Sequence, residues 1–196
     1  MLTITRAGNC AGAGNYAVPT AGADGRGGRA VRGIGLDVRV TDETLWLRPL
    51  TRDEFDAWLP RQTAGYAALI ASSGAMPVQA AQAKAERDTA RNFSRGFATP
   101  GQLVFRVMAG KAGVGWLWLG IPGPDPLMAW VYEIEIEAGF RGRGYGRTAM
   151  RLAEEEVRSR GMTSLGLNVH GQNTVARSLY ESLGYEVTAQ QMKKPL

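Results

Sequence analysis

The segment that decides the fold is Ile134–Gly146, which reads IEIEAGFRGRGYG. Apolar and charged residues alternate from Ala129 to Glu137, and this alternation predicts a β-strand. A glycine-rich turn follows, and the spacing of apolar residues after it predicts a helix from Gly144 to Arg160. The segment therefore predicts a strand, a tight turn and a helix in direct succession.

The turn carries the features of a phosphate-binding site. Glycines let a backbone approach a ligand closely, and the first amides of a helix have no acceptor within the helix. These amides and the helix dipole attract phosphate oxygens, and Arg141, Arg143 and Arg147 add positive charge. We therefore expect a pyrophosphate cradle; a plain turn with solvated arginines is the alternative.

Two other nucleotide motifs match the segment less well. A P-loop needs a lysine followed by Ser or Thr, and Arg147 stands at the lysine position. Residues Gly144–Ala149 match the dinucleotide fingerprint G-x-G-x-x-A, but that fingerprint needs an acidic residue about 20 positions further on. The next predicted strand ends in Asn168–His170 and does not supply one.

Around this segment the sequence predicts one α/β domain. In chain order, the other expected elements are a strand at 45–50, a helix that starts at a Thr51–Glu54 capping box, a helix over 78–93, strands at 102–108, 114–119 and 165–169, a helix capped by Asn173, and a last strand from Tyr185. Pro60 is expected to kink or split the first helix.

The first 40 residues are rich in Gly and Ala, so we expect a disordered tail at 1–40 before one folded domain at 41–196. Apolar residues alternate from Ile34 to Val40, which leaves a short extra strand as the alternative.

The composition excludes several classes of protein. The chain has 196 residues, of which 44% are hydrophobic and 21% charged, so it is not a disordered chain. Cys10 and His170 are the only cysteine and histidine, which excludes a disulfide framework, the common zinc sites and an ordinary Ser-His-Asp triad, and we expect no metal. No apolar run reaches the ~20 residues that span a bilayer, and Met1–Cys10 lacks the features of a secretion signal, so we expect a cytoplasmic protein without a membrane partner.

The net charge of +5 raises the question of nucleic-acid binding. The densest basic group is a compact patch of arginines around the glycine turn, which suits a small polyanion such as a phosphorylated cofactor better than a polymer. Basic and aromatic residues do not interleave along one predicted surface, so we expect no nucleic-acid partner.

Two motifs together resemble a known family. The pattern Arg141-x-x-Gly144-x-Gly146 resembles the acyl-CoA signature of the GCN5-related N-acetyltransferase (GNAT) superfamily. Residues 167–185, with LNV at the start, an asparagine cap and LGY at the end, resemble the second motif of that superfamily. The two motifs lie in the order and at the spacing of the family, and together they cover about residues 130–186.

The resemblance implies a fold and a cofactor. It implies an α/β fold with a mixed, mostly antiparallel sheet of six or seven strands flanked by helices, in which the strands at 129–137 and 165–169 splay apart around acetyl-CoA. The residues it places against the cofactor are Ile134, Glu135, Ile136, Arg141, Gly142, Arg143, Gly144, Tyr145, Gly146, Arg147, Asn173, Ala176 and Tyr180. Asn173 is also explained by helix capping alone.

Acetyl transfer to an amine needs a base for the amine and a proton for the leaving thiolate. Tyr180 stands where many members of the superfamily keep a tyrosine acid, which makes it the candidate acid; a core residue on the predicted helix stripe is the alternative.

The base is less clear. Relatives often place a carboxylate at positions that match Trp130, Tyr132 or Asn168, and none of these residues is acidic. Glu133 or Glu135 acting through water is therefore the candidate base, and His170 is a further candidate. Strict alternation along the strand places the side chains of Trp130, Tyr132, Ile134 and Ile136 on one face and those of Glu133, Glu135 and Glu137 on the other.

The function that follows is an acetyl-CoA-dependent transfer to a primary amine, either a small molecule or a peptide or protein N-terminus. Direct attack in a ternary complex is expected, because the single cysteine lies far from both motifs. A non-catalytic acyl-CoA-binding module is the alternative, and a homodimer is left open.

Overall fold

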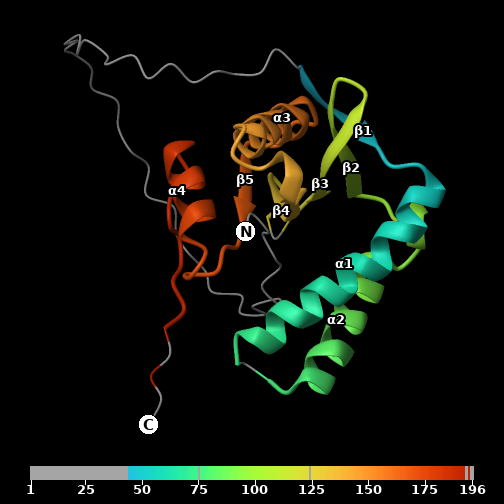
Figure 1. The fold of residues 1–196 in the computed structure, drawn as a ribbon, viewed down its shortest axis with the longest axis vertical. Helices are drawn as coiled ribbons and strands as arrows, with labels where there is room; N and C mark the ends of the chain where they lie inside the picture. The colour runs from blue at the N-terminus through green and yellow to red at the C-terminus, as the bar shows by residue number, and fades with distance from the viewer. Residues whose placement is uncertain (1–43, 75, 124, 193, 195–196) are drawn as a thin grey trace.

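Residues 44–74, 76–123, 125–192 and 194 are described by a computed structural model of the chain (Figure 1). The expected tail at 1–40 and the alternative strand from Ile34 to Val40 lie outside the described residues. The acyl-CoA signature and the second motif lie within them.

One mixed sheet forms the centre of the fold. Its strands are β1 (Leu45–Pro49), β2 (Gln102–Ala109), β3 (Ala112–Gly120), β4 (Met128–Ile136) and β5 (Ser164–Leu167). They lie side by side in sequence order. β1 to β4 are antiparallel neighbours, and β5 runs parallel to β4.

Two expectations about the sheet are wrong. The described residues form five strands instead of the expected six or seven, and Tyr185 does not begin a strand. Most of the side chains from 186 to 192 are exposed, including Val187 and Met192. This segment therefore has no buried face of the kind that fixes the register of a strand.

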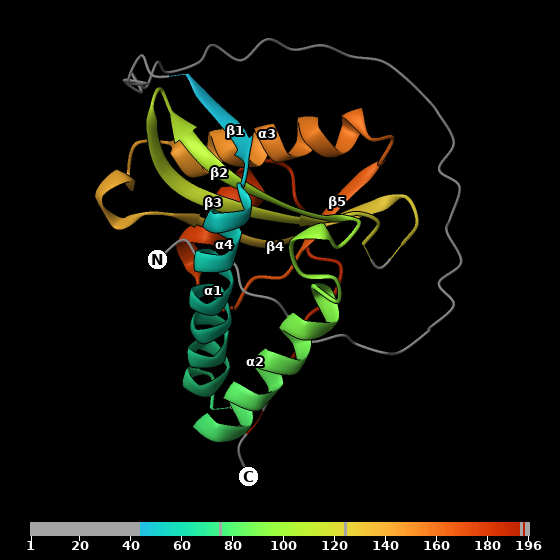
Figure 2. The same cartoon turned by 90° about the vertical axis from the view of Figure 1, so that its right-hand side faces the viewer.

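Helices cover both faces of the sheet (Figures 1 and 2). α3 (Tyr145–Ser159) packs on one face, and α4 (Thr174–Ser182) joins the same core through buried Ala176 and Tyr180. α1 (Arg52–Ser72) and α2 (Val78–Asn92) form a hairpin on the other side of the sheet. An aromatic layer that includes Phe55, Trp58, Phe93 and Trp118 fills the space between α1 and the sheet.

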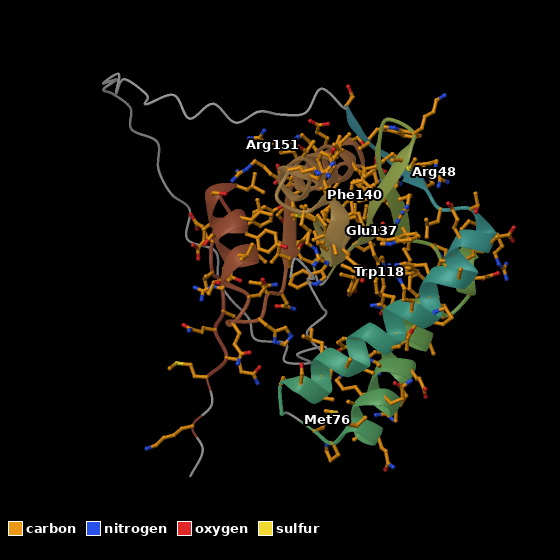
Figure 3. All side chains as sticks on the ribbon, in the orientation of Figure 1. Arg48, Met76, Trp118, Glu137, Phe140 and Arg151 are labelled. Atoms are coloured by element: carbon orange, nitrogen blue, oxygen red, sulfur yellow. The ribbon has the colours of Figure 1, made fainter. Side chains whose placement is uncertain are left out.

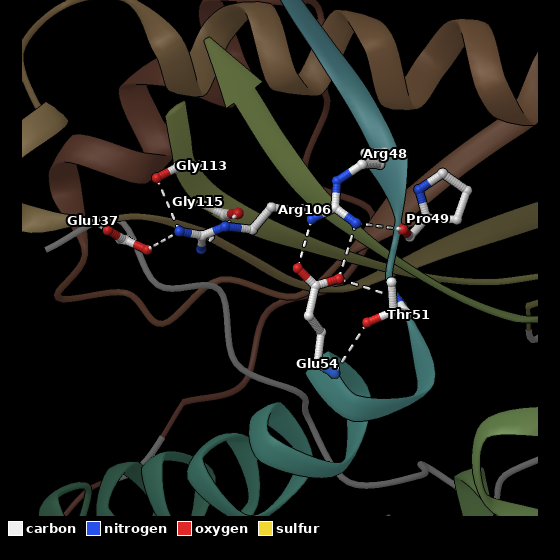
Figure 4. Close-up of polar contacts among 8 residues, drawn as sticks. All are labelled: Arg48, Pro49, Thr51, Glu54, Arg106, Gly113, Gly115 and Glu137. Atoms are coloured by element: carbon white, nitrogen blue, oxygen red, sulfur yellow. Dashed lines mark hydrogen bonds and ion pairs between the residues drawn. The ribbon is translucent and has the colours of Figure 1, made fainter. Parts of the chain in front are cut away.

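The start of α1 confirms the predicted capping box. Thr51 Oγ1 accepts a hydrogen bond from the Glu54 amide at 3.3 Å, and the Glu54 carboxylate accepts one from the Thr51 amide at 2.9 Å. Arg48 at the end of β1 donates two further hydrogen bonds to Glu54 (Figure 4). The expected split at Pro60 is wrong, because α1 continues through this residue to Ser72.

A bulge in β4 overturns the predicted alternation of its side chains. The pairing of β3 with β4 shifts between Trp118 and Leu119, so that Trp118 lies opposite Glu133 whereas Leu119 lies opposite Val131. Tyr132 is the extra residue, and its ring stacks on Trp118 at 4.6 Å between centroids. Tyr132 and Glu133 therefore both face α1, although strict alternation would separate them.

The same bulge moves the first half of the strand to the opposite face. Ala129 and Val131 join Ile134 and Ile136 in the core under α3. Trp130, which we expected to share a face with Ile134, lies on the other face because it alternates with these two neighbours.

Candidate active site

The glycine turn leads directly from the end of β4 into α3. Gly142 and Gly144 have φ angles of 77° and 80°, in the left-handed region that favours glycine. Gly144 caps α3 and makes no side-chain cap hydrogen bond, so the first amides of α3 receive no side-chain acceptor from this position. A Cβ at Gly142 or Gly144 would meet no atom within 4 Å. Backbone conformation, and not crowding by the protein, therefore selects glycine at both positions.

The three arginines of the turn are anchored to the protein as well as charged. Arg141 Nε donates to the Ile136 carbonyl at 2.8 Å, and Arg143 donates to the Gly139 carbonyl at 3.2 Å. Arg147 donates to Ser182 Oγ at 2.7 Å and so joins α3 to α4. The guanidinium groups thus hold the turn in place and put positive charge around it. Ile136 belongs to the residues expected to bind the cofactor, but its carbonyl already accepts the hydrogen bond from Arg141.

β4 extends past the end of its pairing with β5. The last paired residues are Val131 and Leu167, and β4 continues to Ile136. Within the part of the chain that the structure describes, Tyr132–Ile136 has strand partners on β3 only. This unpaired edge lies next to the glycine turn in sequence, as expected for strands that splay apart.

Asn173 lies at the start of α4. Its Oδ1 accepts a hydrogen bond from the Ala176 amide at 3.3 Å, which confirms the predicted cap. Ala176 is fully buried in the core under α3.

Tyr180 is buried on the α3–α4 side of the sheet. Its exposed fraction is 3%, and its hydroxyl has no hydrogen-bond partner among the described residues. Burial raises the pKa of this phenol above its usual value of 10. A buried hydroxyl without a partner costs free energy, and native proteins seldom leave one so unless a ligand or water completes it.

Glu133 is buried on the opposite side of β4, under α1. Its exposed fraction is 7%, and its Oε2 atom has no hydrogen-bond partner within the described chain. Burial, with the nearby charge of Glu135 as a second cause, raises the pKa of Glu133 to about 8, against the opposing effects of Arg61 and the Trp58 indole N–H. A carboxyl group with this pKa exchanges its proton near neutral pH.

A row of alternating charges and one aromatic ring lies beside Glu133. Arg106, Trp116 and Glu135 stand directly opposite one another on β2, β3 and β4. Glu135 pairs with Arg61 of α1 at 3.2 Å. Arg106 pairs with Glu137 at 2.6 Å, as Figure 4 shows. Trp118, the neighbour of this row, points into the layer between the sheet and α1 (Figure 3).

The structure thus places the predicted acid and the predicted bases on opposite faces of β4. Tyr180 shares a core with Ile134 and Ile136, whereas Glu133 and Glu135 face α1. His170, the further candidate for the base, is exposed, and its backbone carbonyl accepts a hydrogen bond from the Asn173 amide at 2.9 Å.

Three side chains of this region lie outside the sequence motifs. Trp58 and Arg61 lie on α1, and Trp116 lies on β3, far from Glu133 in the sequence. None of them belongs to a motif with a fixed spacing from Glu133. Only the packing of α1 on the bulged sheet brings them to the site.

None of the helices in residues 44–192 is both long and apolar enough to cross a bilayer. Over the same described part of the chain, no three His, Cys, Asp or Glu side chains form a group that could hold a metal ion.

Comparisons with known proteins agree with this geometry. The profile of the acetyltransferase (GNAT) family matches residues 73–185. The N-acetyltransferase YycN of Bacillus subtilis is 30% identical over 155 residues, which cover 78% of this chain and 99% of YycN. The crystal structure of YycN superposes with a TM-score of 0.73 over the same shares of the two chains.

Two further similarities are more distant. The crystal structure of a GCN5-related N-acetyltransferase from Ralstonia eutropha superposes with a TM-score of 0.56 at 21% identity, over 78% of this chain and 99% of that one, and so shares the fold. Mycothiol acetyltransferase of Beutenbergia cavernae is 36% identical over 73 residues, which cover 37% of this chain and 24% of that protein. The family match, the full-length relative and the strand–turn–helix at Ile134–Gly146 show that this chain belongs to the GNAT family of acetyltransferases and is an acyltransferase.

Proposed function

We propose that this enzyme transfers an acetyl group from acetyl-CoA directly to a primary amine within a ternary complex, with Glu133 as the general base and Tyr180 as the general acid. The observation that carries the proposal is the pair of buried groups on the two faces of β4. One is a carboxyl group whose pKa is raised to about 8, and the other is a phenol whose hydroxyl has no partner in the described chain.

The residues at the turn fit acetyl-CoA. The glycine turn and the start of α3 offer backbone amides to a pyrophosphate, and Arg141, Arg143 and Arg147 surround it with positive charge. The unpaired edge of β4 offers backbone groups to an extended pantetheine chain, and Asn173 lies at the start of α4, the helix that follows β5. When bound, acetyl-CoA supplies an acetyl group activated as a thioester.

Glu133 suits the role of base. A primary amine with a pKa near ~10 is protonated at neutral pH and must lose a proton before it attacks. A base with a pKa close to the working pH combines a useful deprotonated fraction with adequate basicity, and Glu133 has such a pKa. Glu135, the other predicted base, pairs with Arg61 and contributes chiefly by raising the pKa of Glu133.

Tyr180 suits the role of acid. Its raised pKa keeps the phenol protonated across the ordinary assay range and also makes it a weak acid, so proton transfer to the thiolate depends on direct contact; the hydroxyl has no competing partner in the described chain. Glu133 first takes a proton from the ammonium group and passes it to solvent. As the neutral amine nitrogen then bonds to the acyl carbon, Glu133 accepts the second proton that the nitrogen loses. As the C–S bond breaks, Tyr180 gives its proton to the sulfur, and solvent later restores both groups.

The placement of the two groups supports direct transfer. Direct transfer requires the amine to meet the thioester at the unpaired edge Tyr132–Ile136, between the face that carries Glu133 and the core that contains Tyr180.

A non-catalytic acyl-CoA-binding module stays the second candidate, because the unpaired edge and the glycine turn would serve binding alone. Release of free CoA from acetyl-CoA, measured across a panel of primary amines, separates the two. Turnover with at least one amine supports the enzyme. Acetyl-CoA binding without turnover on any amine would favour the module.

Cofactor binding is tested separately by thermal unfolding. Acetyl-CoA should raise the melting temperature of the wild type, and Gly144→Asp should abolish the rise. Aspartate would adopt the left-handed φ of 80° poorly and would add negative charge where a pyrophosphate binds. Gly139→Asp in the same loop is the matched control, because Gly139 has no positive φ and an added Cβ there meets no atom within 4 Å.

A further inference from the structure

Arg61 holds an exposed place at the rim of the site by two weak contacts. Its guanidinium lies 3.2 Å from the Glu135 carboxylate and 5.3 Å from the centre of the Trp116 ring. The side chain is 53% exposed, and that of Glu135 is 24% exposed. An ion pair this open to water is weak, so another cation can displace Arg61 readily.

Arg106 on the other side of Trp116 is held quite differently. Its side chain is 15% exposed, and it pairs with Glu137 at 2.6 Å. It also donates hydrogen bonds to the carbonyls of Gly113 and Gly115 at 2.9 and 3.3 Å (Figure 4). Arg106 is therefore a fixed part of the sheet, whereas Arg61 is the replaceable cation of the row.

We propose that the place filled by the Arg61 guanidinium is a binding site for a cationic group of the acceptor, and that the substrate class is a diamine or another amine with a second positive charge. Trp116 offers a ring face and Glu135 a carboxylate, which together recognise a cation. Arg61 occupies this site when no acceptor is bound. The inference rests on the proposed function, since it takes Glu133 as the group that receives the reacting amine.

Glu133 gives the second, independent observation. It is more than nine-tenths buried, and its Oε2 atom has no hydrogen-bond partner among the described residues. Its charge interacts with both Glu135 and Arg61, so it lies within reach of the same site. A neutral amine nitrogen at Glu133 would give Oε2 the hydrogen-bond partner that it lacks among the described residues. The cationic group at Glu135 would fix the far end of the acceptor.

The spacing of the two carboxylates sets the length of the acceptor. Glu133 and Glu135 are two residues apart on the same face of β4, after the bulge, so their positions differ by about 7 Å along the strand. A chain of about four or five methylene groups joins two nitrogens over that distance. 1,5-Diaminopentane is therefore the first acceptor to test.

The test compares three five-carbon acceptors: 1,5-diaminopentane, pentylamine with a neutral end, and 5-aminopentanoate with an anionic end. We expect kcat/KM to fall by about tenfold or more from the first acceptor to the second, and further for the third. Glu135→Gln should bring the ratio between diamine and pentylamine close to one, and Trp116→Leu should lower the same ratio. Equal kcat/KM values for all three acceptors in the wild type would overturn the inference.

Arg61→Gln provides the sharper result, because it removes the guanidinium that competes with the acceptor's cationic group for this site. It should lower KM for the diamine by about two- to fivefold relative to KM for pentylamine, a ratio that cancels any shared effect of Arg61 on Glu133. Arg52→Gln is the matched control, because Arg52 lies on the same helix and pairs at 2.7 Å with Asp56 in the exposed first turns. An unchanged or raised KM for the diamine relative to pentylamine in Arg61→Gln would contradict the proposal.

Calorimetric titration of the three amines into the wild type and the variants separates this inference from the proposed function. If no amine is turned over but the diamine binds and loses affinity in Glu135→Gln, the proposed catalysis fails and the cation site stands. If amines are turned over but neither titration nor kinetics separates the diamine from pentylamine, the cation site fails and the proposed catalysis stands.

Discussion

On the α3–α4 side of β4 the site is built largely from backbone, whereas on the α1 side it is built from side chains of three separate elements. The first side consists of the glycine turn, the start of α3 and the cap of α4. The second consists of Trp58 and Arg61 from α1, Trp116 from β3, and Glu133 with Glu135 from β4.

This difference corresponds to the two halves of the reaction. Backbone groups suit a cofactor that every member of a family shares, because their positions depend on the fold and less on side-chain identity. Side chains from separate elements suit an acceptor that differs between members, because single substitutions change them. The comparison therefore predicts that changes on the α1 side act on the amine, and that changes on the α3–α4 side act on acetyl-CoA.

The largest expected effect comes from Glu133→Gln, which removes the base and keeps the shape of the side chain. We expect kcat to fall by about 10²- to 10³-fold, while the affinity for acetyl-CoA stays within about twofold. The wild-type rate should rise with pH and level off above the pKa of Glu133, which is about 8. The variant should lose this rise.

Steady-state kinetics between about pH 6 and pH 10, together with the acetyl-CoA thermal shift, check both parts. If the variant keeps the wild-type rate and pH dependence, Glu133 is not the base. The α1 side of β4 then does not deprotonate the amine as proposed.

The two sides also differ in how well the sequence predicts them. The glycine turn, α3 and the Asn173 cap were predicted within a residue or two, because glycine and helix-capping residues act on their own neighbours in the chain. The strands β2, β3 and β4 were predicted equally closely from alternation.

The α1 side could not be predicted, because it depends on one extra residue. The bulge at Tyr132 reverses the alternation in half of β4, and a periodic pattern contains no signal for it. The contact of Arg61 with Glu135 joins positions 74 residues apart. The missing strand after Tyr185 has a different cause, since the residues that follow it are exposed and offer no buried face to fix a strand register.

The next effect is that of Tyr180→Phe on the other side of β4. The ring and its edge contact with Tyr185 are kept, while the proton is lost, so we expect kcat to fall by about 10²-fold with little change in stability. Because burial raises the pKa of Tyr180, the wild type should show no decline from ionisation of this phenol below about pH 10. Unchanged turnover in the variant, measured by CoA release, would make Tyr180 a core residue and leave water as the acid.

A smaller effect concerns stability, and it follows from the raised pKa of Glu133. The folded state binds this proton more tightly than the unfolded chain, so the stability it contributes is complete below pH 4.5 and is lost as pH rises through about 8. Glutamine does not ionise. The free energy of unfolding of Glu133→Gln should therefore exceed that of the wild type by a few kcal/mol at pH 9 and by much less at pH 5.

Chemical unfolding at the two pH values checks this prediction. Glu86→Gln on the surface of α2 is the control for the removal of one carboxylate. A difference between wild type and Glu133→Gln that stays constant with pH would show that Glu133 is not buried in the way the structure has it.

The smallest expected effects come from a matched pair of helix caps, one on the α1 side of β4 and one on the α3–α4 side. Thr51 caps α1 and Asn173 caps α4, each through one hydrogen bond of 3.3 Å to a backbone amide. Loss of a cap costs ~1 kcal/mol, so Thr51→Ala and Asn173→Ala should lower the free energy of unfolding by similar amounts. Arg48 still holds Glu54 in the first variant, which limits the damage to the cap.

The two caps should differ in function, because only Asn173 lies beside the proposed cofactor site. We expect Asn173→Ala to weaken acetyl-CoA binding by about tenfold, the value of one hydrogen bond, and Thr51→Ala to leave it unchanged. Thr51→Ala should act only on KM for the amine, since α1 carries Trp58 and Arg61. Titration calorimetry with acetyl-CoA and steady-state kinetics measure the two affinities separately. Equal loss of acetyl-CoA affinity in both variants would mean that the caps act through general stability, and the division between a backbone side for the cofactor and a side-chain side for the amine would not hold.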